Sequence, residues 1–405
     1  MTRYRPRENS FVLFEALKNM PVVVLSGMRQ AGKSTLLKNL PQLSGRRYVN
    51  FDDYNILEAA RRDPQELILG GKPVIIDEAQ KFPEILSVIK REVDRKRRPG
   101  QFILSGSANF LLLKNISESL AGRAVYLTLY PFNRREITGA VKESPALVHF
   151  MSKGDFPCRK IKPLNWREVI AGGMPSVCLG EVKQPIVWFR GYEQTYLERD
   201  IRSLSQVADL ISFRHLLQLI SLRNGNVLNI SELARDAKLT VMTATRYLSL
   251  MEASFVIFRL YPYLGNRSSR LIKAPKIYIS DSGLAAYLSG ARKLDAYEPL
   301  RGALLEGYVA QNIQSIISTH SPETKISYWN IQGRFEVDFI LETAGRTIAI
   351  EVKYGSRLRE SDIASLKAYL QTEKYCAGGI VAYNGAEIMK LADKIWAVPV
   401  ALLIS

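Results

Sequence analysis

A glycine-rich loop is the part of the chain whose residue types and spacing indicate chemistry most directly. Residues 27–34, Gly-Met-Arg-Gln-Ala-Gly-Lys-Ser, match the pattern G-x-x-x-x-G-K-[ST] in full, after an apolar run at residues 21–25 and before a segment with helical spacing at residues 34–40. Glycines let backbone N–H groups turn toward phosphate oxygens, and the helix N-terminus adds its positive dipole end. The loop therefore predicts a nucleotide site, with ATP as the expected ligand.

Two side chains of the loop have distinct expected roles. We expect Lys33 to reach the β and γ phosphates and Ser34 to offer its hydroxyl to Mg²⁺. The competing interpretation is a glycine turn that only caps a helix, but a full match arises by chance in only about 1% of chains of this length. The residues expected to contact the nucleotide are Gly27, Arg29, Gln30, Ala31, Gly32, Lys33, Ser34 and Thr35.

A pair of acids supplies the expected partner of this loop. The apolar run at residues 73–76 ends in Asp77 and Glu78, and enzymes with such loops hold their metal with a carboxylate on a neighbouring strand. We expect Asp77 to hold Mg²⁺, through water, and Glu78 to polarise the attacking water, a role that converts binding into hydrolysis. The alternative is two acids that only solvate a strand end.

Further polar residues follow later strands. The run at residues 101–104 leads into Ser105-Gly-Ser-Ala-Asn109, and we expect its hydroxyl and amide groups, Ser105 foremost, near the γ-phosphate or the attacking water. We expect Arg123 to approach the γ-phosphate as an arginine finger or sensor. Ordinary turn residues and a surface arginine are the competing interpretations.

A second set of acids lies near the other end of the chain. Asp338, Glu351 and Lys353 form the pattern D-x(12)-E-x-K on two apolar, strand-like runs, which resembles the pattern of restriction-endonuclease-like metal nucleases. In that chemistry two carboxylates hold Mg²⁺ against the scissile phosphate, and the lysine helps to activate water. Glu306, on a preceding helix, would complete the set, as an acid does in that superfamily. The alternative is a Glu–Lys ion pair in a domain that kept the fold and lost the activity.

The elements that must position these residues divide the chain into four parts. Repeated βα units on a parallel sheet are expected first, then a linker rich in proline, glycine and charge with a helical segment, a helix-turn-helix with strands, and a second α/β unit. The fold class is therefore α/β, with a P-loop domain on a parallel sheet, a middle of helices and strands, and a second α/β domain at the end. The expected bounds are 1–140, 141–205, 206–292 and 293–405.

Several of these motifs together resemble one protein family. The loop, Ile76-Asp-Glu-Ala-Gln-Lys-Phe-Pro83, Leu104-Ser-Gly-Ser107, Leu120-Ala-Gly-Arg123 and Tyr196-Leu-Glu-Arg-Asp-Ile201 are similar to the prokaryotic AAA-type ATPases that carry a C-terminal domain of unknown function. The resemblance spans most of the chain. It implies an AAA+-like P-loop domain, a helical and winged-helix middle and a restriction-endonuclease-like end.

The middle part has the spacing of a DNA-binding motif. Two short helical patterns separated by a tight turn are followed by two strand patterns and a basic loop between them, and residues 206–275 hold nine Lys and Arg against four Asp and Glu. We expect Arg246, Arg267 and Arg270 to contact DNA phosphates. The alternative is a protein–protein module or a lid on the ATPase.

Composition limits which binding partners and which cellular compartment we expect for the chain. The net charge of +17 favours a polyanion, and we place DNA ahead of a membrane because no apolar run reaches the ~18 residues of a transmembrane helix. The start lacks the apolar core of a signal peptide, and three scattered cysteines fit a reducing cytoplasm. A homo-oligomer is compatible with this class.

Two functions follow, with a helicase as a third and weaker one suggested by Asp77-Glu-Ala-Gln80. The first is an ATP-driven enzyme acting on DNA, with a metal-dependent nuclease end. The second is an ATP-controlled regulatory switch whose winged-helix and C-terminal domains bind DNA or protein without cleavage.

Overall fold

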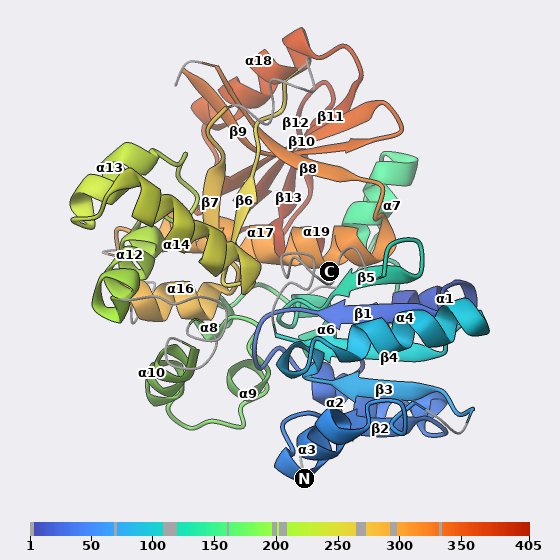
Figure 1. Cartoon of the computed structure of the whole chain (residues 1–405). Helices are drawn as coiled ribbons and strands as arrows, with labels where there is room; N and C mark the ends of the chain where they lie inside the picture. Colours follow the sequence, from blue (N-terminus) through green and yellow to red (C-terminus); the bar gives the residue numbers. More distant parts are fainter. Residues whose placement is uncertain are drawn as a thin grey trace. The chain divides into compact units, whose positions relative to one another are not determined.

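The computed structural model describes residues 4–68, 71–107, 120–159, 162–196, 201, 209–264, 273–291, 298–331 and 334–405. Its residues form two compact units (Figure 1). Unit 1 comprises Met1–Pro131, Glu193–Val207 and Ala253–Val256, and unit 2 comprises Phe132–Tyr192, Ala208–Glu252 and Ile257–Ser405.

Unit 1 is built on a five-stranded parallel sheet with the strand order β2-β3-β4-β1-β5. Its central strands are continuous apolar runs because both faces of a parallel sheet are covered. The strands are β1 Val22–Ser26, β2 Arg47–Asn50, β3 Val74–Asp77, β4 Phe102–Gly106 and β5 Ala124–Thr128.

Helices cover both faces of this sheet, and the alternation along β1 shows how. Val22 and Val24 belong to a core cluster shared with α3 and α4, whereas Val23 and Leu25 belong to a cluster shared with α1 and α2. The expected repeat of βα units on a parallel sheet is confirmed. The helices are α1 Asn9–Asn19, α2 Lys33–Asn39, η1 Pro41–Leu43, α3 Tyr54–Arg62, η2 Ala79–Lys81 and α4 Ile85–Arg95.

Unit 2 begins with short helices where the sequence predicts a linker. Residues 146–153 are helical, although the prolines and glycines around them predict irregular chain. Pro145 stands directly before this helix and Gly154, with φ of 81°, ends it, so these residues act as helix boundaries. The helices are α6 Arg134–Thr138, α7 Ala146–Lys153, α8 Trp166–Ala171, α9 Pro175–Cys178 and α10 Pro185–Thr195.

The middle of the chain contains the predicted helix-turn-helix spacing. Helices α13 and α14 are joined by a turn in which Lys238 has a φ of 55°, and β6 and β7 form an antiparallel pair. The elements are α12 Leu210–Leu222, α13 Ile230–Asp236, α14 Val241–Ala253, β6 Ile257–Leu260, β7 Lys276–Ile279 and α16 Ser282–Ser289.

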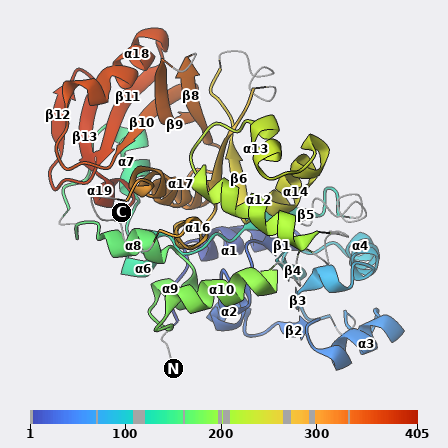
Figure 2. The ribbon, with the colours of Figure 1, turned by 90° about the vertical axis from the view of Figure 1, so that its left-hand side faces the viewer.

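The last part of unit 2 is a mixed six-stranded sheet with the order β12-β13-β11-β10-β9-β8. Helices α17 and α18 lie on opposite sides of the strands in both views (Figure 1 and Figure 2). The elements are α17 Arg301–His320, β8 Lys325–Ile331, β9 Phe335–Thr343, β10 Arg346–Lys353, η5 Glu360–Ile363, α18 Ala364–Thr372, β11 Cys376–Tyr383, β12 Met389–Ala392, β13 Ile395–Pro399 and α19 Val400–Leu403.

Candidate functional site

The glycine-rich loop follows the carboxyl end of β1 and leads into α2. Gly27 has a φ of 149°, and a Cβ on it would lie 2.2 Å from the Leu129 carbonyl oxygen. Gly32 stands before α2 with a left-handed φ of 96°. Both positions therefore require glycine, one for a close backbone approach and the other for its conformation.

The Lys33 side chain turns back onto its own glycine-rich loop. Its ammonium donates to the carbonyl oxygens of Gly27, at 2.8 Å, and Met28, at 2.9 Å, and its side chain is buried. The ammonium is thus held within the loop, in a position to pair with an anion. Of the other predicted contact residues, Ala31 is buried, Arg29, Gly32 and Ser34 are half-buried, and Gln30 and Thr35 are exposed.

Arg7 supports the loop from the N-terminal segment. Its guanidinium donates to the carbonyl oxygens of Ala31, at 2.7 Å, and Tyr130, at 2.6 Å. Because this buried arginine ties the loop to the chain after β5, it fixes the backbone that presents the N–H groups. The sequence analysis missed Arg7, which no motif marks.

Ser34 and Asp77 converge on one hydroxyl group. Tyr48, on β2, donates to Asp77 Oδ2 at 2.5 Å, and the Ser34 side chain lies close enough to lower the pKa of the same hydroxyl. Burial, followed by the Asp77 contact, raises the pKa of Tyr48. A hydroxyl and a carboxylate within reach of the same atom are hard oxygen donors of the kind Mg²⁺ takes, so the donor set fits this ion. Tyr48 was also missed by the sequence analysis.

Glu78 is held next to this set in a strained backbone. Its φ is 55°, a left-handed value, and Gln80 Nε2 donates to its carboxylate at 2.5 Å. Burial raises the pKa of Glu78, and the Lys33 charge opposes that shift. A carboxylate with a raised pKa is better suited to accept a proton from water near neutral pH.

Ser105 lies where the sequence places it, at the carboxyl end of β4 beside β1. It pairs in register with Leu25, and its Oγ is buried without a hydrogen-bond partner in the described part of the chain. Ser107 Oγ lies 3.5 Å from Gln80 Nε2, which connects this strand end to Glu78. Asn109 lies outside the described residues.

Arg123 requires a correction. It precedes β5, whose first residue, Ala124, pairs with Val22 at the start of β1, so Arg123 lies at the amino edge of the parallel sheet. The loop lies at the opposite edge, beyond the five residues of β1, which span about 17 Å. Its guanidinium instead pairs with Asp94 at 2.6 and 2.9 Å. The expectation that Arg123 approaches the γ-phosphate is therefore wrong for the loop of its own chain.

Only one of the three predicted DNA contacts lies within the described ranges. Arg246 is exposed on α14, whereas Arg267 and Arg270 lie outside the described residues.

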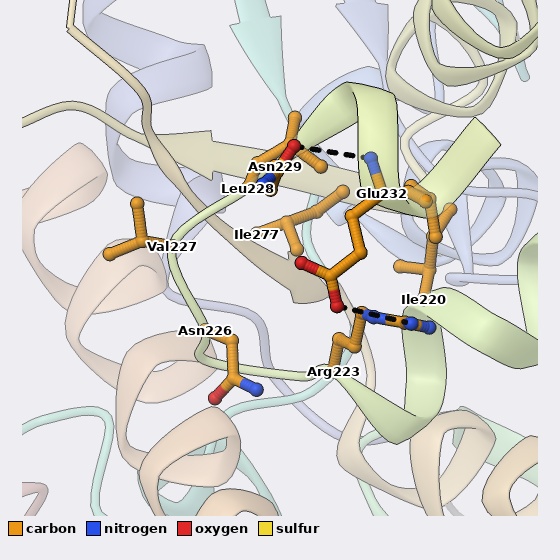
Figure 3. Close-up of a pocket in the computed structure, with 9 residues that line it drawn as sticks. Ile220, Arg223, Asn226, Val227, Leu228, Asn229, Glu232 and Ile277 are labelled. Carbon is orange, nitrogen blue, oxygen red and sulfur yellow. Dashed lines mark hydrogen bonds and ion pairs between the residues drawn. The ribbon is translucent and has the colours of Figure 1, made fainter. Parts of the chain in front are cut away.

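A cavity of about 120 Å³ opens beside α12, α13 and β7 (Figure 3). In it Arg223 faces Glu232 at 3.9 Å and also pairs with Asp236, so acids compensate the arginine in this cavity.

The C-terminal acids are brought together as predicted, but around a lysine. Lys276, the first residue of β7, places its ammonium 3.0 Å from Glu306 Oε1, 2.7 Å from Glu336 Oε1 and 3.0 Å from Asp338 Oδ1. Its side chain is 1% exposed. The sequence analysis missed Lys276 and Glu336.

Glu351 and Lys353 form a separate ion pair beside this lysine. Lys353 Nζ donates to Glu351 Oε1 at 2.8 Å, and Val352 N donates to Asp338 Oδ2 at 2.9 Å. Burial, followed by the charge of Asp338, raises the pKa of Glu351 to about 8 and that of Glu306 to about 7.

These contacts do not fit the expected Mg²⁺ site of Asp338, Glu351 and Glu306. An ammonium already contacts Glu306 and Asp338, and no group of three His, Cys, Asp or Glu in the described ranges has the arrangement of a metal site. We therefore derive no metal-dependent step at these carboxylates.

Among the described residues, none of the helices could span a membrane.

Three domain families match the chain along its length. An AAA domain matches residues 19–138, one domain of unknown function (DUF8612) matches residues 164–295, and another (DUF4143) matches residues 301–403. The first covers the parallel sheet with its loop, and the last covers the mixed sheet with its carboxylates.

Uncharacterised bacterial proteins are similar to this chain over most of its length. The protein Rv2008c of Mycobacterium tuberculosis and Mb2031c of Mycobacterium bovis are each 30% identical over 402 residues, which is 97% of this chain and 83% of theirs. A Haemophilus influenzae protein is 23% identical over 296 residues, 67% of this chain and 70% of its own. Among solved structures, the Walker-type ATPase PABY2304 of Pyrococcus abyssi covers 71% of this chain and 99% of its own at 17% identity, with a TM-score of 0.43.

Proposed function

The chain belongs to the family of the mycobacterial protein Rv2008c and carries an AAA-type P-loop ATPase domain, and from this premise we propose that it hydrolyses Mg-ATP to act on DNA. The convergence of Ser34 and Asp77 on the Tyr48 hydroxyl, next to the loop that holds Lys33, supports this proposal most strongly. It brings a hydroxyl, a carboxylate and an ammonium together at one edge of the sheet.

Each residue then has a defined task. Lys33 exchanges its loop carbonyl partners for phosphate oxygens, while the backbone N–H groups of residues 27–35 cradle the phosphates. Ser34 and, through water, Asp77 would hold Mg²⁺, which would neutralise phosphate charge when bound. Glu78, kept in place by Gln80, accepts the proton of the attacking water. Ser105 contacts the γ-phosphate or that water through the Oγ that has no other partner in the described part of the chain.

Two variants test the nucleotide proposal. Lys33→Ala should lose ATP binding because the phosphate charge goes unmatched. Glu78→Gln should bind ATP but turn it over at least ~100-fold more slowly, the usual weight of a positioned base. Glu84→Gln, which changes an exposed acid of the same domain, is the matched control. Wild-type affinity and turnover in Lys33→Ala would refute the proposal.

Contact with DNA is the second part of the proposal. It is supported by the net charge of +17 and by the exposed Arg246 on the second helix of the helix-turn-helix segment. We assign Arg267 and Arg270 to the same contact. The triple alanine variant should lower the slope of log affinity against log salt by about 0.9 for each DNA phosphate that it no longer neutralises. An unchanged slope would make this segment a protein interface.

The proposal also covers the cellular compartment and the oligomeric state of the chain. The three cysteines are free thiols, which fits a reducing cytoplasm. We also propose a homo-oligomer, in which Arg123 would serve as the finger for the loop of a second copy. Sedimentation with and without ATP tests this state, and a monomer in both would contradict it.

Two functions compete for the C-terminal domain. In the first, Asp338, Glu351 and Lys353, with Glu306, cut DNA with a metal ion. In the second, the domain binds DNA or protein without cleavage and the ATPase acts as a switch. The ammonium of Lys276 among the carboxylates favours the switch.

A plasmid-nicking assay separates these two functions. Wild type and Asp338→Ala are incubated with supercoiled DNA and Mg²⁺ or Mn²⁺, with and without ATP. The switch predicts no cleavage by either protein. Cleavage by wild type that Asp338→Ala loses would establish the nuclease.

A further inference from the structure

Lys276 is a buried cation contributed by one segment of the chain to the carboxylates of another. We propose that its ammonium is the resident cation of this cluster, closes the cluster to divalent metal ions and fastens β7 to the C-terminal domain. The inference deepens the switch function described above.

The first argument is the match between donors and acceptors. A lysine ammonium has three N–H donors and no acceptor. Three carboxylates, those of Glu306, Glu336 and Asp338, approach it within 3.0 Å. Since each donor has a carboxylate oxygen as its acceptor, these contacts offset the cost of burying the lysine.

The second argument is the shortage of free oxygen atoms for a metal ion. Asp338 accepts from Lys276 through one oxygen and from Val352 N through the other, and Glu351 Oε1 accepts from Lys353. Glu351 Oε2 is buried without a hydrogen-bond partner in the described part of the chain. Divalent cations such as Mg²⁺ and Ca²⁺ take six or more oxygen ligands, and most carboxylate oxygens of this cluster already accept hydrogen bonds, so the cluster as it stands does not make their site.

The third argument is how firmly the lysine is held. All four residues of β7 are buried, and Lys276 pairs in register with Leu260 of β6. Two positions along the same strand, Tyr278 donates to Glu306 Oε1 at 2.6 Å. The strand therefore contributes two side chains to one carboxylate, and the ammonium cannot leave without disturbing β7.

Charge explains what the substitution of this lysine would do. Without the ammonium, the acids of the cluster repel one another, while Lys353 stays paired with Glu351. Carboxylate oxygens released together are the ligands that divalent cations prefer. Lys276→Ala should therefore create a divalent-cation site that the wild-type chain lacks.

Mn²⁺ titration of the nucleotide-free full chain, followed by electron paramagnetic resonance of the free ion, tests the proposal. Lys276→Ala should gain one Mn²⁺ site that the second substitution Asp338→Asn removes. Wild type, Asp338→Asn and the control Lys273→Ala, which changes an exposed lysine three residues earlier, should not bind Mn²⁺ at the cluster. Mn²⁺ should also raise the melting temperature of Lys276→Ala by about 3–8 °C, the effect of a site occupied well above its dissociation constant.

Two results would overturn the proposal. One is Mn²⁺ binding by wild type that Asp338→Asn abolishes, because the cluster would then hold a metal despite the lysine. The other is a folded Lys276→Ala that gains no Mn²⁺ site. If Lys276→Ala does not fold, wild type against Asp338→Asn still decides: equal Mn²⁺ binding supports the proposal. The titration involves no ATP hydrolysis, so its outcome is separate from that of the nucleotide proposal.

Discussion

Gly27→Ala probes the close contact on which the phosphate loop depends. The added Cβ would lie 2.2 Å from the Leu129 carbonyl oxygen, whereas ordinary contact begins at 3.4 Å. The loop and the chain after β5 would therefore have to separate by about 1.2 Å, the difference between these distances. The φ of 149° at this position is also a backbone value that residues other than glycine rarely adopt.

The expected loss of stability follows from these two effects, the close contact and the strained backbone. Overpacking of a rigid site costs about 1–3 kcal/mol, and a strained backbone adds about 1–3 kcal/mol. We expect the free energy of unfolding to fall by about 2–6 kcal/mol in total. A displacement of ~1 Å in a positioning group can cost ~100-fold in rate, so turnover should fall at least that far.

The assay compares ATP affinity, ATP turnover and guanidinium denaturation in Gly27→Ala, Gly45→Ala and wild type. Gly45 is a matched control because a Cβ there meets nothing within 4 Å. Gly27→Ala should be impaired in all three measurements and Gly45→Ala in none. If Gly27→Ala binds ATP and resists denaturant like wild type, the contact with Leu129 does not shape the loop.

Three further predictions follow from contacts in the two units. Because burial raises the pKa of Glu351 to about 8 and that of Glu306 to about 7, the folded chain holds protons that the unfolded chain loses above about pH 4.5. The free energy of unfolding should therefore fall as pH rises from 5 to 8, by up to about 1.4 kcal/mol per pH unit and group. If the free energy of unfolding of Glu351→Gln has the same slope against pH as that of wild type, this reasoning is contradicted. Arg7→Ala should lower stability by about 1.5–3 kcal/mol and weaken ATP binding, because Ala31 loses its donor; calorimetry that finds both unchanged would rule out its support of the loop. Arg123→Ala should keep wild-type ATP affinity at concentrations where the chain is a monomer, since its guanidinium pairs with Asp94 away from the loop of its own chain. Weaker nucleotide binding by that monomer would contradict this placement.

The nucleotide site shows which residues a sequence pattern reveals. The loop and the acids that follow β3 are local motifs, so their types and spacing predicted them. Tyr48 became part of the site because β2 lies next to β3, a strand order that no local pattern contains. Arg7 reaches the loop from the N-terminal segment, and Arg123 was misplaced because its motif does not tell which edge of the sheet it occupies.

The C-terminal domain shows the same division. The spacing of Asp338 and Glu351 predicted that two strands would bring them together, and the helix and strands around them were predicted correctly. Lys276 stands 62 residues before Asp338, on a strand assigned to the middle domain. Its ionic role depends on how β7 packs against α17 and β9, which only the three-dimensional structure provides.

The central claim, that the loop and its paired acids form an ATPase, is tested most directly by ATP turnover in Glu78→Gln alongside its ATP affinity. The account predicts wild-type affinity with turnover at least ~100-fold lower. Because Gln80 can hydrogen-bond to the substituted amide, as it does to the carboxylate, the loss should come from the missing base. Turnover at the wild-type rate by Glu78→Gln would contradict the account.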